Sequence, residues 1–400
     1  MRSYFSALLL LLLFLPVVDA QAGLLLGRED REKEERRAGK ARQSVDGPWL
    51  MTYYVGYQNH YLKPRDVDYS LMTHIVVGGV SVNSDGTLDE HWHLSNGDTD
   101  DGRDMAEDVG RRADREGVKK LVWLGGPNEE DKFYSASSKS NRARFVENIV
   151  ELVEDLDYDG VDIDWEPIRA KDEEHVLRLV RDLRKAAPDM LITIPVNWVP
   201  TTIAATKDLD VYDEMASYVD KFFVMSYSMA GPWPGWDVWH GGALKGDTWT
   251  TPGSVRTSIY AYERAGVPED QLGIGIGTYA TCWEFPVRKP RQDVPSGFAP
   301  KHIGVTTMRD IEKNYYKQKY EKWDAKAQVP YLSLPRATGE WDCGFISYEN
   351  EKSVEAKMEY VLESDLGGAI IWNIGTGYYP DKSRSKRHPL LKAAADTLGL

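Results

Sequence analysis

The stretch Tyr158-Asp159-Gly160-Val161-Asp162-Ile163-Asp164-Trp165-Glu166 alternates acidic and apolar side chains along one predicted strand. Successive side chains of a β-strand point to opposite faces, so every second residue shares a face, about 6.6 Å apart. Apolar side chains therefore cover one face of this strand. The other face carries three carboxylates, which we call the acidic row: Asp162, Asp164 and Glu166.

Strand-like apolar runs recur on both sides of this segment, and most are separated by helical patterns. This alternation predicts an α/β protein with a (β/α)8 TIM barrel rather than a doubly wound sheet. The eight predicted strands are Leu50–Tyr57, His74–Val82, Lys120–Leu124, Gly160–Trp165, Leu191–Val196, Phe222–Tyr227, Leu272–Tyr279 and Gly368–Trp372.

Helices are predicted where apolar residues recur at helical spacing. The predicted helices are Arg142–Leu156, Glu173–Ala187, Val211–Val219, Ser254–Ala265, Thr307–Trp323, Ser353–Ser364 and Pro389–Leu398. The seventh return to the barrel is long, from Ala280 to about Asn350. We expect it to be a modest insertion that holds an extra helix and a small strand pair, Gln328–Leu334 and Cys343–Tyr348.

The acidic row is expected to face the barrel interior, because its apolar partners suit the face on which helices pack. Three neighbouring buried carboxylates cannot all ionise cheaply, so at least one pKa should be raised. A protonated carboxyl group at the C-terminal mouth of a barrel can act as a general acid. The alternatives are an edge strand with solvated acids or a cation site.

The segment DGVDIDWE resembles the D-G-x-D-x-D-x-E signature of glycoside hydrolase family 18, the chitinases and their relatives. The resemblance covers roughly residues 48–398. It implies that Glu166 protonates the glycosidic oxygen, Asp164 orients the acetamido group of the substrate, and Asp162 shares a proton with Asp164. It also implies substrate assistance, in which the N-acetyl carbonyl attacks the anomeric carbon and the configuration is retained.

Other positions resemble the family with two departures. Tyr227 matches the tyrosine of its M-x-Y segment and would hydrogen-bond the acetamido carbonyl, but Ser228 stands where Asp is frequent. Trp372 matches the tryptophan beneath the −1 sugar. In the third strand Trp123 replaces a serine. Structural roles are assigned to three further residues: Gly125 and Gly126, which allow close backbone packing, and Asp159.

Several aromatic and polar residues at strand ends and in one loop are candidate sugar contacts, because pyranose rings stack on flat aromatic side chains. A packing role in the core is the alternative for each of them. The candidates are Tyr57, Tyr279, Asn197, Trp198, Trp233, Trp236 and Trp239.

The composition bears on the binding partners, the cofactors and the state of the two cysteines. Lys and Arg number 49 and Asp and Glu number 63, so the net charge of −14 disfavours nucleic acid and anionic membranes as partners. No metal site or cofactor motif is recognised, and no cofactor is expected. Cys282 and Cys343 either pair after export or remain free thiols.

The N-terminus has the features of a secretory signal. Arg2 precedes the apolar run Ala7–Val18, which is shorter than the roughly 20 residues of a membrane span. We expect a signal peptide at 1–20, a charged linker at 21–47 and the catalytic barrel at 48–400. An uncleaved anchor is the alternative.

These observations predict a secreted, monomeric, retaining hydrolase that cleaves β-1,4 bonds at N-acetylglucosamine units of chitin or chitooligosaccharides. Two alternatives remain. One is an endo-β-N-acetylglucosaminidase acting on N-glycan or peptidoglycan, and the other is a non-hydrolytic chitinase-like lectin.

Overall fold

A computed structural model describes residues 47–95, 98–294, 301–303 and 307–400. The predicted signal peptide, and the predicted linker apart from Gly47, lie outside the described residues. The description below concerns the unit that begins at Gly47.

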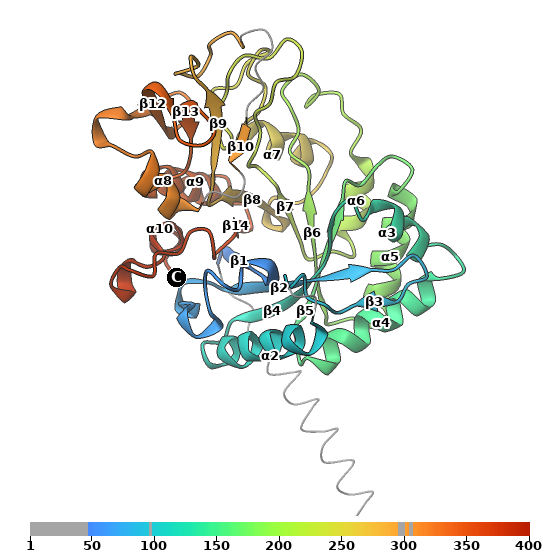
Figure 1. Cartoon of the computed structure of the whole chain (residues 1–400). Coiled ribbons are helices and arrows are strands. Elements are labelled where there is room, and N and C mark those ends of the chain that lie inside the picture. The colour runs from blue at the N-terminus through green and yellow to red at the C-terminus, as the bar shows by residue number, and fades with distance from the viewer. Residues whose placement is uncertain (1–46, 96–97, 295–300, 304–306) are drawn as a thin grey trace, which may run out of the picture. The chain divides into compact units, whose positions relative to one another are not determined.

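Eight parallel strands close into a barrel, in the order β1-β2-β4-β5-β6-β7-β8-β14 and back to β1 (Figure 1). The predicted TIM barrel is confirmed, and all eight predicted strands are present. Three of them end earlier than predicted: β1 stops at Val55, β7 at Val224 and β8 at Gly277. The strands are β1 (Trp49–Val55), β2 (His74–Val82), β4 (Lys119–Pro127), β5 (Gly160–Glu166), β6 (Leu191–Val196), β7 (Lys221–Val224), β8 (Leu272–Gly277) and β14 (Gly368–Trp372), with β3 (Leu88–Asp89) antiparallel to β2.

Helices surround the strands and bury one apolar face each. In α5, for example, Val176, Leu179, Val180 and Leu183 recur at helical spacing and are all buried. The α-helices outside the insertion are α2 (Thr99–Arg115), α3 (Glu130–Ala136), α4 (Arg142–Asp155), α5 (Glu173–Ala186), α6 (Asp210–Ala216), α7 (Val255–Arg264), α9 (Glu351–Glu363) and α10 (Pro389–Leu398). Short 3-10 helices are η1 (Gly56–Gln58), η2 (Pro64–Asp66), η3 (Tyr69–Leu71), η4 (Glu269–Gln271), η5 (Gln318–Tyr320) and η6 (Arg384–Lys386).

The two faces of the barrel wall belong to different hydrophobic clusters. Val161, Ile163 and Trp165 of β5 join the large cluster between strands and helices. The second cluster is formed by alternate residues of other strands, among them Tyr53 and Trp123. Since β5 turns its apolar residues outward, its carboxylates point inward, as the alternation predicts.

The insertion after β8 is larger than the predicted strand pair. It forms a five-stranded antiparallel sheet in the order β10-β9-β13-β12-β11, with the predicted pair as β13 and β12 (Figure 1). Its elements are β9 (Ala280–Glu284), β10 (Lys301–Ile303), α8 (Met308–Asn314), β11 (Glu321–Asp324), β12 (Val329–Thr338) and β13 (Cys343–Ser347).

The helix predicted over Thr307–Trp323 is wrong in its second half. Helix α8 begins with a capping box at Thr307 and ends before Tyr315. Residues Glu321–Asp324 then pair antiparallel with β12. The chain turns after Asp324 and pairs with β12, which begins at Val329, so hairpin pairing overrides the helical apolar spacing there.

The two cysteines lie on neighbouring strands of this second sheet. Cys282 in β9 and Cys343 in β13 form a disulfide with a Cα–Cα distance of 5.6 Å. Both residues are fully buried. The disulfide therefore links the start of the insertion to its last strand.

Candidate active site

The acidic row lies along the C-terminal half of β5 and becomes less buried towards the end of the strand. Asp162 is fully buried, Asp164 is 5% exposed, and Glu166 is only partly buried. The C-terminal ends of barrel strands are where active sites of this fold are found. The row thus runs from the barrel interior to its mouth.

Asp162 is held by two hydroxyl donors. Tyr53 on β1 donates to Oδ2 at 2.6 Å, and Thr193 on β6 donates to Oδ1 at 2.6 Å. Burial raises the pKa of Asp162 to about 7, although both hydrogen bonds lower it. Asp162 is therefore a carboxyl group held by two donors, with a pKa raised towards neutrality.

Asp164 has one side-chain donor, the indole Nε1 of Trp123 on β4, which lies 3.0 Å from Oδ2. Its other oxygen, Oδ1, is buried and makes no hydrogen bond. Burial, Glu166 and Asp162 together raise the pKa of Asp164 well above its ordinary value. Ionisation of Asp164 is thus opposed by its surroundings, and its Oδ1 is available to accept a hydrogen bond.

Glu166 ends the strand, and burial raises its pKa above the ordinary value. Because it is less buried than the two aspartates, it is the member of the row most open to the barrel mouth. A raised carboxyl pKa keeps the proton available to a leaving group.

Two glycines of the neighbouring strand β4 lie directly beside the acidic row. Gly125 and Gly126 pair with Asp164 and Trp165 in the β4–β5 register, at φ of +91° and +128°. A Cβ at Gly125 would lie 2.3 Å from the ring of Phe133. Both positions require glycine because the φ values are left-handed and the Gly125 site has no space.

Asp159 holds the start of β5 against β4. Its carboxylate accepts from the backbone N–H of Lys120 at 2.9 Å and lies 3.2 Å from Nζ of Lys119. These contacts fit the structural role assigned to this residue.

Three tyrosines at the ends of other strands surround the acidic row. Tyr227 follows β7, and burial together with Tyr279 and the carboxylates of the row raises its pKa well above the ordinary value. Tyr279 follows β8, and its hydroxyl lies 2.7 Å from that of Ser228. Tyr57 in η1 is 39% exposed, and its pKa is raised by burial and by the charge of Asp164. All three are thus within electrostatic reach of the row.

Trp372 ends β14 and is partly buried within the barrel. Its ring meets Tyr53 at a centroid distance of 5.0 Å and Trp123 at 5.3 Å, both edge to face. Tyr53 and Trp123 are the donors to Asp162 and Asp164. Trp372 therefore packs directly on the side chains that hold the acidic row.

The sequence model of the family described as glycosyl hydrolases family 18 matches residues 50–377, which is most of the chain. The chain belongs to glycosyl hydrolase family 18. The acidic row falls within the matched residues, on the β5 strand of this family 18 barrel.

Curated relatives of the family 18 barrel include two endochitinases. The probable endochitinase of Caenorhabditis elegans is 25% identical over 384 residues, covering 88% of this chain and 60% of that protein. The endochitinase of Manduca sexta is 25% identical over 316 residues, covering 70% of this chain and 54% of that protein. The chain spans little more than half the length of these relatives.

Solved structures similar to the family 18 barrel include both an enzyme and a pseudo-enzyme. The Ostrinia furnacalis Group IV chitinase in complex with allosamidin has a TM-score of 0.73 at 22% identity and covers 88% of this chain and 99% of that one. Human YKL-39, described as a pseudo-chitinase with retained chitooligosaccharide binding, has a TM-score of 0.72 at 19% identity, with 88% and 100% covered. At these identities the likeness shows the fold alone.

Trp198 and two tryptophans of the loop after β7 form a cluster on the family 18 barrel. Trp198 lies 6.0 Å from both Trp233 and Trp236, and those two rings are 4.6 Å apart. Trp233 is 43% exposed and Trp236 is partly buried. Asn197 precedes the cluster, and its backbone carbonyl accepts from the hydroxyl of Tyr262 at 2.7 Å.

Trp239 does not belong to this cluster, so its prediction as a sugar contact is wrong. It is fully buried, and its indole N–H donates to the backbone carbonyl of Gly253 at 2.6 Å. It packs in a separate hydrophobic cluster beneath the second sheet. The bulk of a buried indole and its satisfied N–H make it a core residue.

We expect Trp233→Ala to lower kcat/KM on long chitooligosaccharides by roughly tenfold, about 1.4 kcal/mol, and to change a short chromogenic substrate much less. Only long chains would reach a ring remote from the reacting sugar. The matched control is Trp239→Ala, which should lose about 3–5 kcal/mol of stability and affect all chain lengths alike. Measuring kcat/KM against chain length, with a melting curve for each variant, separates the two cases. Uniform loss of activity in the Trp233 variant would contradict the prediction that this ring contacts sugar.

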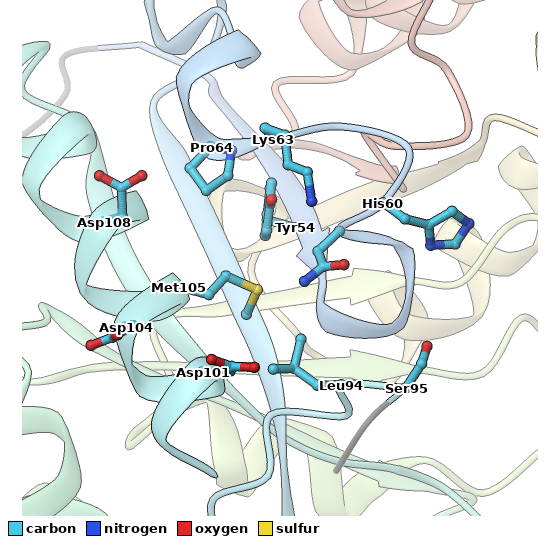
Figure 2. Close-up of a pocket in the computed structure, with 11 residues that line it drawn as sticks. Tyr54, His60, Lys63, Pro64, Leu94, Ser95, Asp101, Asp104, Met105 and Asp108 are labelled. Carbon is cyan, nitrogen blue, oxygen red and sulfur yellow. The ribbon is translucent and has the colours of Figure 1, made fainter. Parts of the chain in front are cut away.

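A cavity of about 640 Å³ lies between α2 and the segment that follows β1 (Figure 2). Three carboxylates of α2, Asp101, Asp104 and Asp108, contribute to its lining together with Tyr54. Tyr54 belongs to the outer hydrophobic cluster, whereas the neighbouring Tyr53 points inward. The cavity is thus on the outer side of β1 and separate from the acidic row.

Neither a metal-binding cluster nor a membrane-spanning helix is present in the part of the chain that the structure describes. No group of three or more His, Cys, Asp or Glu side chains there is arranged to hold a metal ion. Across the same residues, none of the helices combines the length and apolar character that a membrane span requires.

Proposed function

We propose that this family 18 barrel is a secreted, retaining glycoside hydrolase that cleaves β-1,4 bonds at N-acetylglucosamine units by substrate assistance. The observation that carries the proposal is the acidic row, with a raised pKa at Asp162, Asp164 and Glu166 and with Glu166 nearest the mouth. A binding protein has no need for a protonated carboxyl group at this point.

In this mechanism Glu166 is the general acid. It donates its proton to the glycosidic oxygen while the acetamido carbonyl oxygen of the −1 sugar attacks the anomeric carbon. The C–O bond to the leaving sugar breaks, and an oxazolinium ion forms. Glu166, now a carboxylate, then removes a proton from the water that opens this ion, so two displacements retain the configuration.

The aspartates orient and stabilise the acetamido group. Asp164 accepts a hydrogen bond from its N–H, and the free Oδ1 is an acceptor for this bond. The nearby carboxylate also stabilises the positive charge of the oxazolinium ion. Asp162, whose pKa is near 7, shares a proton with Asp164.

Aromatic and phenolic groups complete the proposed −1 site. Tyr227 donates to the acetamido oxygen as it becomes the nucleophile, and Trp372 forms the apolar floor. Ser228 cannot supply the charge of the aspartate frequent in the family. Its hydroxyl instead contacts Tyr279 at 2.7 Å, which orders the rim beside Tyr227.

Chitin or chitooligosaccharides are the proposed substrates, supported by the endochitinase relatives. The cluster of Trp198, Trp233 and Trp236 suits a sugar contact, since it places an exposed indole, that of Trp233, beside two others. An endo-β-N-acetylglucosaminidase acting on N-glycan or peptidoglycan would use the same chemistry. Export to the outside of the cell is proposed from the features of residues 1–20, and a monomer is proposed for the barrel.

A lectin is the second candidate, because a pseudo-chitinase is among the similar structures. Incubation of the purified protein with chitotetraose distinguishes the two. We expect new reducing ends to accumulate with multiple turnovers per protein molecule. Binding of chitotetraose without any release of reducing ends would overturn the hydrolase and support the lectin.

A further inference from the structure

The indole of Trp123 contacts a residue two positions further along β5 than its backbone partner. In the β4–β5 register Trp123 pairs with Asp162, yet its Nε1 donates to the next member of the acidic row, Asp164, at 3.0 Å. The side chain is only 2% exposed. This donor is therefore inside the barrel, where hydrogen bonds to a carboxylate are strong.

Three aromatic rings pack edge to face against the indole of Trp123. Their centroids lie 5.0 Å away for His93, 5.3 Å for Trp372 and 6.1 Å for Tyr53. A Cβ at Gly79 would come within 3.1 Å of the indole, so a glycine there makes room for it. The ring is thus packed on several sides before any substrate arrives.

We propose that Trp123 is a positioning residue of the reaction, which fixes one oxygen of Asp164 so that the other, Oδ1, is presented to the acetamido N–H of the substrate. Oδ1 is buried and has no hydrogen-bond partner, as expected for an acceptor reserved for a ligand. This proposal deepens the proposed function and rests on it.

The same hydrogen bond favours the ionised form of Asp164. Burial, and the charges of Glu166 and Asp162 on the same strand and of Glu129 before α3, raise the pKa of Asp164 and so oppose its ionisation. The phenols that face this carboxylate from other elements are those of Tyr53, Tyr57 and Tyr227, and burial together with the charge of Asp164 raises their pKa, which keeps them neutral. Trp123 acts in the opposite direction and lowers the pKa of Asp164. An ionised Asp164 is needed both to accept the acetamido N–H and to face the oxazolinium ion.

The test removes the N–H and keeps as much of the ring as possible. Trp123→Phe, and replacement of Trp123 by 3-benzothienylalanine, both delete the donor, and the second keeps the two-ring shape if the first fails to fold. Without the donor the pKa of Asp164 rises, so the carboxylate is lost at a higher pH. We expect the acid limb of the kcat/KM profile on chitotetraose to move up by about one pH unit, with kcat lowered more than KM is raised.

Trp49→Phe is the matched control. Trp49 is a buried indole of the same inner cluster, and its Nε1 has no hydrogen-bond partner. Trp49→Phe removes the same atoms as Trp123→Phe but no hydrogen bond. The acid limb of its kcat/KM profile should therefore stay in place, even if the variant is less stable. An unmoved acid limb in both Trp123 variants would overturn the positioning role while leaving the hydrolase intact.

A second readout does not depend on activity. The indole ¹⁵N–H signal of Trp123, identified by its loss in Trp123→Phe, should shift as Asp164 titrates, and it should change in Asp164→Asn. A signal that changes neither with pH nor in Asp164→Asn would overturn the proposal. A wild-type protein that shows this coupling and yet releases no reducing ends would instead contradict the proposed function.

Discussion

Replacing Glu166 by glutamine is expected to lower kcat on chitooligosaccharides by several orders of magnitude while the fold and sugar binding are retained. The amide is nearly isosteric with the carboxyl group but has no acidic proton to give to the leaving oxygen. General acid catalysis alone contributes about 10²–10⁴-fold, and a sugar alkoxide leaves poorly without it. The measurements are kcat from reducing-end release and Kd for chitotetraose by calorimetry.

Glu174→Gln is a suitable control for this experiment. Glu174 is an exposed carboxylate of α5 whose side chain is 67% exposed, so its substitution should leave kcat unchanged. A melting curve shows whether the Glu166 variant is folded. A folded Glu166→Gln protein with near-native kcat would remove Glu166 from the mechanism.

The second large effect concerns the substrate. Cellotetraose should not be cleaved detectably under conditions that hydrolyse chitotetraose completely, because it has a hydroxyl group where the acetamido nucleophile should be. Without that carbonyl no oxazolinium ion can form, so the first displacement has no nucleophile. Product analysis by chromatography after equal incubation times gives the comparison.

A thiazoline analogue provides the complementary evidence for the acetamido nucleophile. It resembles the charged intermediate and should inhibit chitotetraose hydrolysis far more strongly than N-acetylglucosamine itself does. Clean hydrolysis of cellotetraose would show that the acidic row acts by a route that needs no acetamido group, with a protein carboxylate or water as the nucleophile.

The barrel and the acidic row could be predicted because each rests on a local pattern. The alternation in Gly160–Glu166 sets which side chains share a face, and the requirement that helices cover the apolar face sends the acids inward. Since the same alternation applies to β1, it also places Tyr53 on the inner face, where it contacts Asp162. The alternation does not predict the contact itself, because β1 and β5 do not pair and the two side chains meet inside the barrel.

Other features depend on strand pairing and packing that the local apolar pattern does not specify. Trp239 shares a loop and a residue type with Trp233, yet it is buried under a sheet whose five strands come from the long insertion. The segment Glu321–Asp324 has helical spacing but pairs with β12. In the same way, Trp123 is a departure from the family motif in sequence, and only the packed structure reveals it as the donor to Asp164.

The most direct test of substrate-assisted hydrolysis by the acidic row is the anomeric form of the first product. Proton NMR spectra recorded during the first minutes with chitotetraose, before mutarotation, distinguish the two anomers of the newly formed reducing end. Two displacements through an oxazolinium ion predict that the β-anomer appears first and that the α-anomer grows in only as mutarotation proceeds. Initial release of the α-anomer would mean a single displacement by water and would contradict the mechanism proposed for Glu166 and Asp164.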